Sequence, residues 1–367
     1  MNSLVFSNML HRPARTAVSI IGIGVGILLI VFTVGLANGS LRERAKREAN
    51  IGAEIMVRPS GSMGWSGSET PRLSASLADE IEKMDGVEQA IPIIQTSVSA
   101  KDSNTGSRII EGVDLDTYSQ VSGLTIVKGR AFTPGTDEAV CDAAFFAQKK
   151  FSIGEPIDLF GRTFTLVGIY EPSVGARVKI PLGTMQKQLD GEGRATAILV
   201  KLKPGQSVDA VGERLDKDLP NTQVLLTRDI EELYMQGVPA LNVFLNVVIG
   251  IAGFISALII LLTMYTTVSE RTRQIGVLKS LGMSNFTIGW TIVQEALLIA
   301  LGGIIFGVVS TIILSIALAK WTTLTVQVDP KVVGGILIVG LLSSLVGALY
   351  PGLKAARLDA VEALSFE

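Results

Sequence analysis

Residues 270–290 read ERTRQIGVLKSLGMSNFTIGW, a short basic stretch between two long apolar segments. The segment before it, 240–268, carries no charged residue, and the segment after it, 287–318, carries only Glu295. Both segments are long enough to cross a bilayer as helices. The pattern therefore predicts that the chain leaves a membrane, makes one charged turn and enters the membrane again.

Four apolar segments predict four transmembrane helices, because about 20 helical residues, each rising 1.5 Å, span the hydrocarbon core. With their flanks they occupy residues 14–40, 236–268, 287–318 and 332–350. A secretory signal peptide is the competing interpretation of the first segment, since basic residues precede it. Its apolar run is longer than a signal sequence requires and lacks a clean small-residue cleavage site. These features favour a span that is retained.

Composition narrows the class of protein. Of the 367 residues, 48% are hydrophobic and 18% are charged, which is typical of a membrane protein that also carries a soluble domain. The net charge of −2 argues against nucleic acid as a partner. A single cysteine, Cys141, excludes a disulfide within the chain, and we expect it to be a small buried residue in a strand. A single histidine, His11, excludes a multi-histidine metal site.

Catalytic motifs do not emerge from the sequence. No stretch matches the GxxxxGKS/T loop that cradles phosphates, so we do not expect this chain to hydrolyse ATP itself. No pair of carboxylates is placed for acid–base work. The sequence therefore predicts a non-catalytic membrane chain that binds no metal and no cofactor of its own.

The distribution of basic residues predicts the topology, because lysine and arginine in short loops mark the cytoplasmic side. Arg12 and Arg15 precede the first span, Lys354 and Arg357 follow the last, and the central turn is also basic. Four spans put these three regions on one side of a cell (inner) membrane. We therefore expect both termini in the cytoplasm and residues 41–235 in the extracytoplasmic space.

The two ends and the last loop are short. Residues 1–13 have the pattern of an amphipathic helix that lies in the membrane interface, with a frayed terminus as the alternative. Residues 319–331 form a short outside loop, and residues 351–367 form a cytoplasmic tail.

Residues 41–235 predict a stalk followed by an α+β domain. The charged run at 41–50 continues the first span as a helix. Strand–helix–strand patterns at 51–113 and 194–230 flank a β-rich insertion at 114–193. The predicted fold class is thus an α-helical membrane protein with four transmembrane helices and an α+β extracytoplasmic domain, in which a split β-α-β lobe contains a β-rich inserted lobe.

The basic turn predicts a short amphipathic helix. Its apolar stripe is Ile275, Leu278 and Leu281, and Gly282 can end the helix while Ser284 caps the next one. The polar surface comes from Arg271, Arg273, Gln274 and Lys279. Periodicity alone leaves two interpretations open: docking into a groove of a cytoplasmic protein, or lying on the membrane with the basic residues on anionic lipid.

Two motifs carry a family resemblance. ERTRQIGVLKSLGMSNFTI resembles the signature of the MacB/FtsX-like family of ABC transporter permeases, E-R-T/K-x-E/R-I-G-x-L-K/R-A-x-G-A/M-S. The ending ALYPGLKAARLDAVEAL is similar to that family's P-x-x-x-A-A-x-x-x-P-x-E-A-L. The order of one span, a large outside domain and three spans also matches. The chain departs from the family pattern at Gln274, where an acid is usual, and at Ala360, where proline is usual.

The resemblance implies that this chain forms the membrane part of a complex and that a separate subunit binds ATP. Residues 269–286 would hold a cytoplasmic coupling helix that engages a separate ABC ATPase subunit. The matching positions are Glu270, Arg271, Arg273, Gln274, Ile275, Gly276, Leu278, Lys279, Leu281 and Gly282. Two permeases and two ATPases would assemble, with ATP and magnesium held by the ATPase. Rigid helices would carry its motion to a porter-like lobe formed by 51–113 and 194–230, a mode of action called mechanotransmission.

The cargo is left open. The leading hypothesis is export or extraction of a hydrophobic or amphipathic substrate, and the alternative is a signalling module that mechanically activates an external partner such as a cell-wall hydrolase. A docking scaffold without turnover is a third hypothesis. A periplasmic adaptor is a candidate partner, and Met63 and Trp65 are candidate contacts for it or for substrate. Glu295 is either structural or linked to substrate, and its place near the end of a span favours the structural role.

Overall fold

The structure is a computed structural model that describes residues 13–62, 70–100, 107–236, 239–319 and 326–359. The chain divides into two compact units, one of residues 1–40 with 239–367 and the other of residues 41–238. The predicted interfacial helix lies outside the described residues except for its last position. So do Met63 and Trp65.

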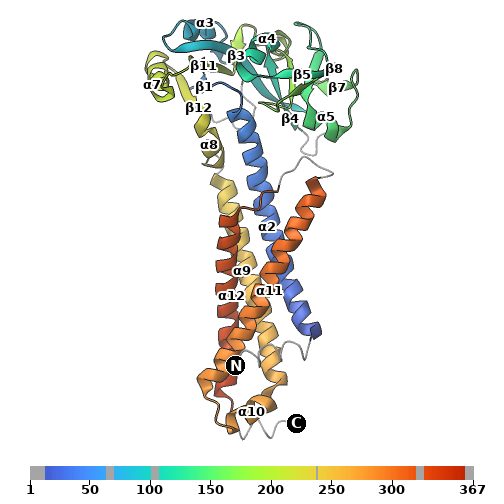
Figure 1. Cartoon of the computed structure of the whole chain (residues 1–367), viewed down its shortest axis with the longest axis vertical. Coiled ribbons are helices and arrows are strands. Elements are labelled where there is room, and N and C mark those ends of the chain that lie inside the picture. The colour runs from blue at the N-terminus through green and yellow to red at the C-terminus, as the bar shows by residue number, and fades with distance from the viewer. Residues whose placement is uncertain (1–12, 63–69, 101–106, 237–238, 320–325, 360–367) are drawn as a thin grey trace. The chain divides into compact units, whose positions relative to one another are not determined.

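The first unit is a bundle of long helices (Figure 1). Within the described residues, four helices are long and apolar enough to cross a membrane, which confirms the predicted number of spans. They are α2 (Pro13–Ala49), α9 (Pro239–Glu270), α11 (Asn285–Ala319) and α12 (Pro330–Arg357). A shorter helix, α10 (Thr272–Ser280), lies between α9 and α11.

Local sequence sets where these helices begin. The Thr287 backbone N–H donates to the Ser284 hydroxyl at 3.2 Å, which caps α11 as expected. The Lys331 backbone N–H donates to the Asp329 carboxylate at 2.9 Å, and Pro330 occupies the first position of α12, where its missing N–H has no consequence. The helix starts therefore follow from residues next to the apolar runs.

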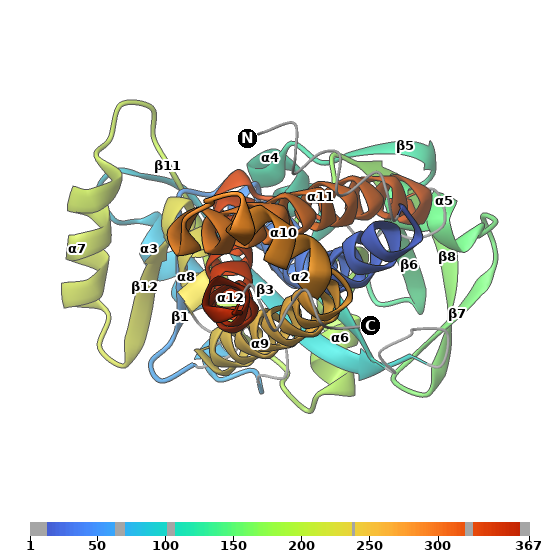
Figure 2. The same ribbon diagram turned by 90° about the horizontal axis from the view of Figure 1, so that it is seen from below.

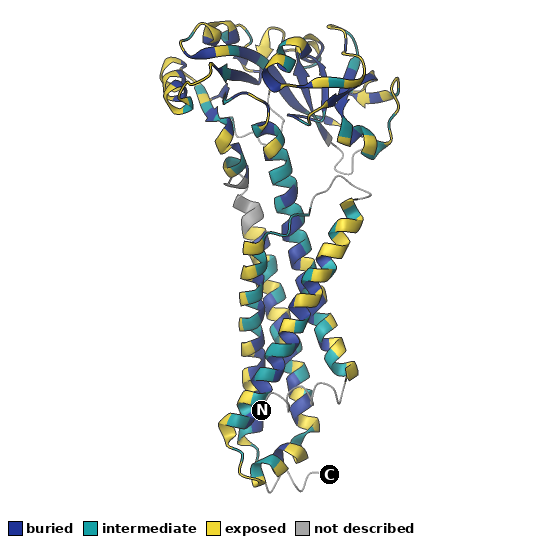
Figure 3. Ribbon diagram, viewed as in Figure 1, coloured by how far each residue is buried: buried dark blue, intermediate teal, exposed yellow. Residues whose placement is uncertain are grey.

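Small residues allow the membrane helices to pack closely. In Figure 2 α12 runs beside both α9 and α11, and it makes extensive contact with each. A Cβ added to Gly307 of α11 would lie 2.6 Å from the Gly24 carbonyl oxygen of α2. Only glycine permits that approach, as is common between membrane helices. Figure 3 shows exposed residues along the outer sides of the long helices. The exposed apolar residues of these helices include Val25, Phe254 and Ile313. Such apolar faces suit contact with lipid.

The second unit, residues 41–238, is built around a mixed sheet. Its helices are the C-terminal part of α2, α3 (Leu77–Glu82), α4 (Leu115–Ser122), α5 (Ala143–Lys149), α6 (Leu182–Gln188), α7 (Val208–Asp218), a 3₁₀ turn η1 (Thr227–Asp229) and α8 (Ile230–Gln236). Its strands are β1 (Ile55–Pro59), β2 (Leu73–Ser74), β3 (Val87–Ser99), β4 (Ser107–Val113), β5 (Thr125–Gly129), β6 (Glu138–Asp142), β7 (Pro156–Leu159), β8 (Arg162–Glu171), β9 (Val178–Pro181), β10 (Arg194–Ala195), β11 (Ala197–Leu202) and β12 (Thr222–Leu226).

One strand joins the two lobes of this unit. The main sheet has the order β12-β1-β11-β3-β4-β9-β6-β8-β5, with β7 added beside β8. The first half of β3 pairs with β11, and its second half pairs with β4. β4 then pairs in parallel with β9 of the β-rich insertion. The split β-α-β lobe and the inserted lobe therefore share one hydrogen-bonded sheet, through a strand of 13 residues.

The strands of the split lobe bury both of their faces. Along β1, Ile55 and Val57 lie in the core that α3 and α7 cover. Met56, between them, points to the opposite core, which also contains Ala45 of α2. This alternation follows from the period of two along a strand. A separate core fills the inserted lobe and includes Cys141, which confirms that this cysteine is a buried strand residue.

Candidate functional site

The basic turn forms helix α10, and its end has the expected glycine. Gly282 has a φ of +91°, a backbone conformation that residues with a Cβ rarely adopt. The Met283 N–H bonds to the Leu278 carbonyl at 3.2 Å, and the Gly282 N–H bonds to the Lys279 carbonyl at 3.0 Å. These two bonds form a Schellman motif, which confirms that Gly282 ends the helix.

Three charged residues connect α10 and its flanks to the other membrane helices. Glu270, the last residue of α9, pairs with Arg15 of α2. Arg271, just before α10, lies with its Nη1 3.8 Å from Oε2 of Glu295 in α11. At the other end, Lys279 donates to the backbone carbonyls of Ala356 at 3.0 Å and Leu358 at 2.5 Å, at the end of α12. The turn is therefore anchored to α2, α11 and α12.

The outward side of α10 is exposed and of mixed character. Arg273, Gln274 and Ser280 are exposed, and Val277 adds an apolar side chain among them. Leu281, at the end of the helix, is 77% exposed. We call these five residues the outer face of α10. A surface with exposed aliphatic side chains next to a cation and an amide is suited to binding another protein.

The predicted apolar stripe of α10 is wrong. Ile275 is only 8% exposed and belongs to the core of the membrane bundle, together with the buried Gly276, whereas Leu281 is among the most exposed residues. Leu278 is half-buried. Successive helical residues differ by about 100° of rotation, so positions three apart drift by about 60° at each step. The three residues therefore run from the inner to the outer side of the helix.

The ten predicted coupling residues thus divide into two groups. Those that face inward or make anchoring contacts are Glu270, Arg271, Ile275, Gly276 and Lys279. Arg273, Gln274, Leu281 and Gly282 are exposed, and Leu278 lies between the two groups. The inward group positions the helix, and the exposed group is available to a partner.

Glu295 lies in a polar site inside the bundle. With Arg271 it lines a small recess that also includes Arg15 of α2, Thr263 and Thr267. The recess gathers two arginines around a carboxylate that is otherwise costly inside a membrane. The pairing with Arg271 accords with the structural role that we favour for Glu295.

The stalk, residues 41–50, makes contacts that the sequence did not indicate. Glu43 pairs with Arg177, and Arg47 Nη1 lies 3.9 Å from Oδ2 of Asp142. The Gly175 N–H also donates to the Arg47 carbonyl at 2.9 Å. All three partners belong to the β-rich insertion. Glu43 and Arg47 also stand at the i,i+4 spacing that favours a pair within a helix, but both side chains reach residues more than 90 positions away.

A neighbouring side of the stalk, about 100° around the helix, contacts β1 and α8. Glu48 Oε2 lies 3.7 Å from Arg58 Nη2 of β1, and the guanidinium of Arg44 lies 5.5 Å from the ring centre of Tyr234 in α8. Burial raises the pKa of the Tyr234 hydroxyl, so this group stays neutral. The end of α2 is therefore held by charged contacts to both lobes of residues 41–238.

A buried ion pair lies in the middle of this unit. Lys179 of β9 and Glu111 of β4 pair with no exposed surface on either side chain. The hydroxyl of Tyr118 donates to Glu111 at 3.2 Å, and Gln95 donates to it at 3.3 Å. Burial lowers the pKa of Lys179, and Glu111 opposes that effect. The carboxylate is satisfied by hydrogen bonds, so the cluster is structural and resembles no catalytic arrangement.

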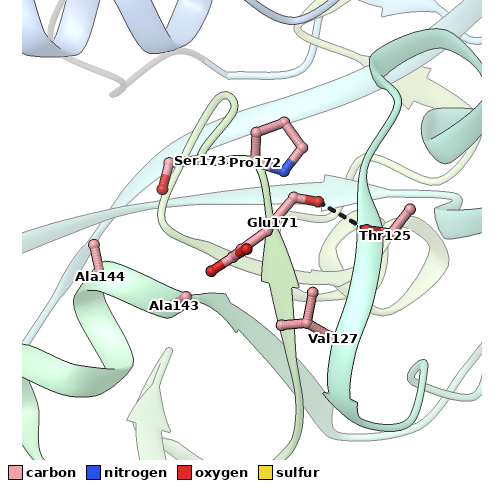
Figure 4. Close-up of a pocket in the computed structure, with 7 residues that line it drawn as sticks. All are labelled: Thr125, Val127, Ala143, Ala144, Glu171, Pro172 and Ser173. Atoms are coloured by element: carbon pink, nitrogen blue, oxygen red, sulfur yellow. Dashed lines mark hydrogen bonds between the residues drawn. The ribbon is translucent and has the colours of Figure 1, made fainter.

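The inserted lobe carries an open recess of about 470 Å³ (Figure 4). Val127 of β5, Ala143 at the start of α5, and Pro172 beyond β8 line it. Thr125 donates from its hydroxyl to the Glu171 carbonyl at 3.2 Å on one side. The lining is mostly apolar and brings together no pair of titratable groups. It can offer a contact surface to another molecule.

Comparisons with known proteins cover both units. A family model described as the MacB-like periplasmic core domain matches residues 16–218, and one described as the FtsX-like permease C-terminal matches residues 246–360. The chain belongs to the MacB/FtsX-like family of ABC transporter permeases. The second match contains α10 and all of its anchoring partners except Arg15.

Two curated relatives differ in length. MacB of Acinetobacter baylyi, named a macrolide export ATP-binding/permease protein, is 25% identical over 97% of this chain and 58% of its own length. YknZ of Bacillus subtilis, named an uncharacterized ABC transporter permease, is 23% identical over 99% of this chain and 98% of its own length. This MacB/FtsX-like chain thus spans little more than half of the MacB protein that it matches.

Two solved structures are similar to parts of this chain. The match to the periplasmic region of MacB from Actinobacillus actinomycetemcomitans covers 50% of this chain and 93% of the solved chain, with 18% sequence identity and a TM-score of 0.37. The match to the extracellular domain of the transporter YknZ from Gram-positive bacteria covers 47% of this chain and 98% of the solved chain, with 17% sequence identity and a TM-score of 0.36.

Family membership establishes the broad role of the chain. A MacB/FtsX-like permease is a membrane-embedded component of an ABC transporter with an extracytoplasmic domain.

Proposed function

We propose that this chain is the permease subunit of an ABC exporter and that the outer face of α10 is where a separate ATPase subunit engages it. The observation that carries the proposal is the anchoring of α10. Contacts at both of its ends join it to α2, α11 and α12, while its outer face is left exposed. A force applied to the outer face would then move several membrane helices together.

The path of the motion follows from the same contacts. Glu270 and Arg15 join the turn to the first part of α2, which is a single helix of 37 residues. A continuous helix transmits a displacement that a flexible linker would absorb. At the other end of α2, Glu43 and Arg47 are paired with the inserted lobe. We therefore propose mechanotransmission, in which ATP binding and hydrolysis in the partner moves the extracytoplasmic domain.

The assembly and its orientation belong to the same proposal. Two copies of this chain and two ATPase subunits would form the complex, with ATP and magnesium bound by the ATPase. Both termini and α10 would lie in the cytoplasm, as the basic residues of the turn and the tail support. The near-full-length match to YknZ, a permease by name, supports an ATPase on a separate chain.

The proposed cargo is a hydrophobic or amphipathic molecule taken from the membrane or the extracytoplasmic space. The name of the MacB relative, a macrolide export protein, supports export over a signalling role. A periplasmic adaptor is a proposed additional partner, and the open recess beside Val127 in the inserted lobe is a surface that it could contact.

The outer face is tested by co-purification. We expect Leu281→Asp to abolish recovery of the ATPase that co-purifies with the wild-type chain, because it places a charge in the exposed apolar part of the surface. Asn285→Asp is the matched control: it adds the same charge four residues away, at the exposed start of α11, where a carboxylate is favourable. Full recovery of the ATPase with Leu281→Asp would refute the proposed contact.

A further inference from the structure

The start of α11 and the end of α12 form an apolar groove that the proposed function does not use. It has a volume of about 410 Å³ and is lined by residues of these two helices only. Gly289 and Gly352 form its floor, since a Cβ on either would lie 3.4 Å from the carbonyl oxygen of the other. The two helices approach closely there, and their larger side chains stand on both sides as walls.

The walls are aromatic on one side and aliphatic on the other. Phe286 and Trp290, one turn apart on α11, stack with ring centres 6.5 Å apart and planes 4° from parallel. Leu349 and Leu353 of α12 stand opposite and are about half exposed. A tryptophan at the end of a membrane helix is typical of the interface between hydrocarbon and headgroups.

One cation marks the end of the groove nearest α10. Arg357 lines the groove in the last turn of α12 and is exposed. Among the residues that the structure describes, the Arg357 guanidinium has no hydrogen-bond or ion-pair partner. Its neighbour Lys354 is different, because it donates to the Tyr265 hydroxyl at 3.1 Å on the side of α9. The groove therefore combines apolar walls with one guanidinium available for an anion.

We propose that this groove binds an anionic phospholipid, with an acyl chain between α11 and α12 and the phosphate on Arg357. Basic pockets between membrane helices at the cytoplasmic side are typical sites for anionic headgroups. A guanidinium also matches the geometry of a phosphate group. The assignment of the groove to the inner leaflet rests on the proposed orientation of the chain.

The length of the groove favours a lipid over a soluble protein. Leu345, at its far end, precedes Arg357 by 12 residues, or about 18 Å along a helix at 1.5 Å per residue. A site that begins at a charged end and continues that far along a membrane helix is accessible to an acyl chain. An ATPase in the cytoplasm could reach only its first turn.

The groove adjoins α10, so its occupancy would affect the coupling helix. Ala356, another lining residue, has the carbonyl that accepts a hydrogen bond from Lys279 of α10 at 3.0 Å. Phe286, the second residue of α11, follows Gly282 by four residues. A bound lipid would brace the end of α12 against which α10 is held, and anionic lipid would then favour the anchored position of α10.

The test uses the full chain, without the ATPase, so that it is independent of the proposed coupling. Trp65 and Trp321 are replaced by phenylalanine, which leaves Trp290 as the single tryptophan. The protein is reconstituted in phosphatidylcholine vesicles that contain a minor fraction of phosphatidylglycerol. Either the phosphatidylglycerol or an equal amount of phosphatidylcholine carries brominated acyl chains, which quench tryptophan fluorescence on contact.

From the quenching of Trp290 we expect the groove to bind phosphatidylglycerol about fivefold more tightly than phosphatidylcholine. One basic residue near the membrane surface contributes about 1 kcal/mol to the binding of an anionic lipid, and that energy corresponds to about a fivefold difference in affinity. Arg357→Gln should remove that preference. Arg273→Gln is the matched control, because it removes one exposed cation on α10 that does not line the groove. This variant should keep the preference.

Three results would overturn the proposal. Equal quenching by the two lipids would mean that the groove does not select an anionic headgroup. An equal loss of preference in Arg357→Gln and Arg273→Gln would mean that general surface charge attracts the lipid. Quenching that appears only after deletion of residues 2–12 would mean that the N-terminal segment of the chain occupies the groove.

Discussion

Arg271 lies 3.8 Å from Glu295, so the residue that precedes α10 is paired with a residue inside the membrane helix α11. The two side chains are mostly buried, with 14% and 8% exposed. A charge pair in such a place resists separation, because moving α10 away would leave a carboxylate in an apolar environment. The pair therefore fixes the base of α10 to the bundle.

Removal of the Glu295 carboxylate should loosen this attachment. We expect Glu295→Ala to lower the stability of the membrane bundle by about 1–3 kcal/mol, the range for a buried polar group that loses its partner. Thermal unfolding of the purified full chain measures the effect. Glu295→Gln, which keeps the size and a hydrogen-bonding group, should lose less. Equal stability of wild type and both variants would show that the pair does not hold α10.

The other end of α10 depends on Lys279. Lys279→Met removes two hydrogen bonds to the end of α12, and we expect faster amide hydrogen exchange in residues 272–282 and in the last turn of α12. Arg273→Met is the control, because that exposed side chain is on the outer face. Both segments should exchange at the wild-type rate in the control. The same acceleration in the two variants would contradict the assigned anchor.

The stalk contact between Glu43 and Arg177 can be tested by exchange of charge. Glu43→Arg alone should destabilise residues 41–238, because it brings a third cation to Arg177 and the nearby Arg47. Combining it with Arg177→Glu should recover part of the loss, with a coupling energy of about 1 kcal/mol for a partly exposed pair. A double-mutant cycle by thermal unfolding measures it. Strictly additive effects of the two substitutions would exclude a direct pair.

Cys141 should be chemically inert in the folded chain. Burial raises the pKa of its thiol to about 12, from an ordinary value of 9. At pH 9 the folded protein should therefore resist alkylation by iodoacetamide, whereas denaturant should expose the thiol to reaction. The pKa of the thiol is higher in the folded state than in the unfolded state. The stability that the buried, neutral thiol contributes is therefore fully present below pH 9. It is lost as the pH rises through about 12. Rapid alkylation of the native protein at pH 9 would contradict this account.

Apolar length and local turn chemistry made the membrane architecture predictable. The four spans follow from uninterrupted apolar runs, and Gly282 and Ser284 mark helix boundaries because their signals lie within a few residues. The burial of Ile275 was not predictable in the same way. A nine-residue helix allows several placements of an apolar stripe, and contacts with α2, α11 and α12 decide which side faces inward.

Charge pairs between residues far apart in the sequence could not be predicted from sequence patterns. Lys179 lies in a strand whose other residues are apolar, and only its pairing with Glu111, 68 positions earlier, explains why it is buried. The partner of Glu43 is 134 positions away, although Arg47 stands at the favourable helical spacing. The sequence also did not predict that β3 pairs with strands of both lobes, because strand pairing depends on which segments come together in the folded chain.

The most direct test of the account is photo-crosslinking from α10 in intact cells. A photo-reactive phenylalanine derivative at Leu281 should form an adduct with a protein that contains a GxxxxGKS/T motif, identified by mass spectrometry. The same group at Ile275, on the inward side, should not reach that protein. An adduct at Leu281 that contains only lipid or other membrane proteins would contradict the role of α10 as the point where the ATPase acts.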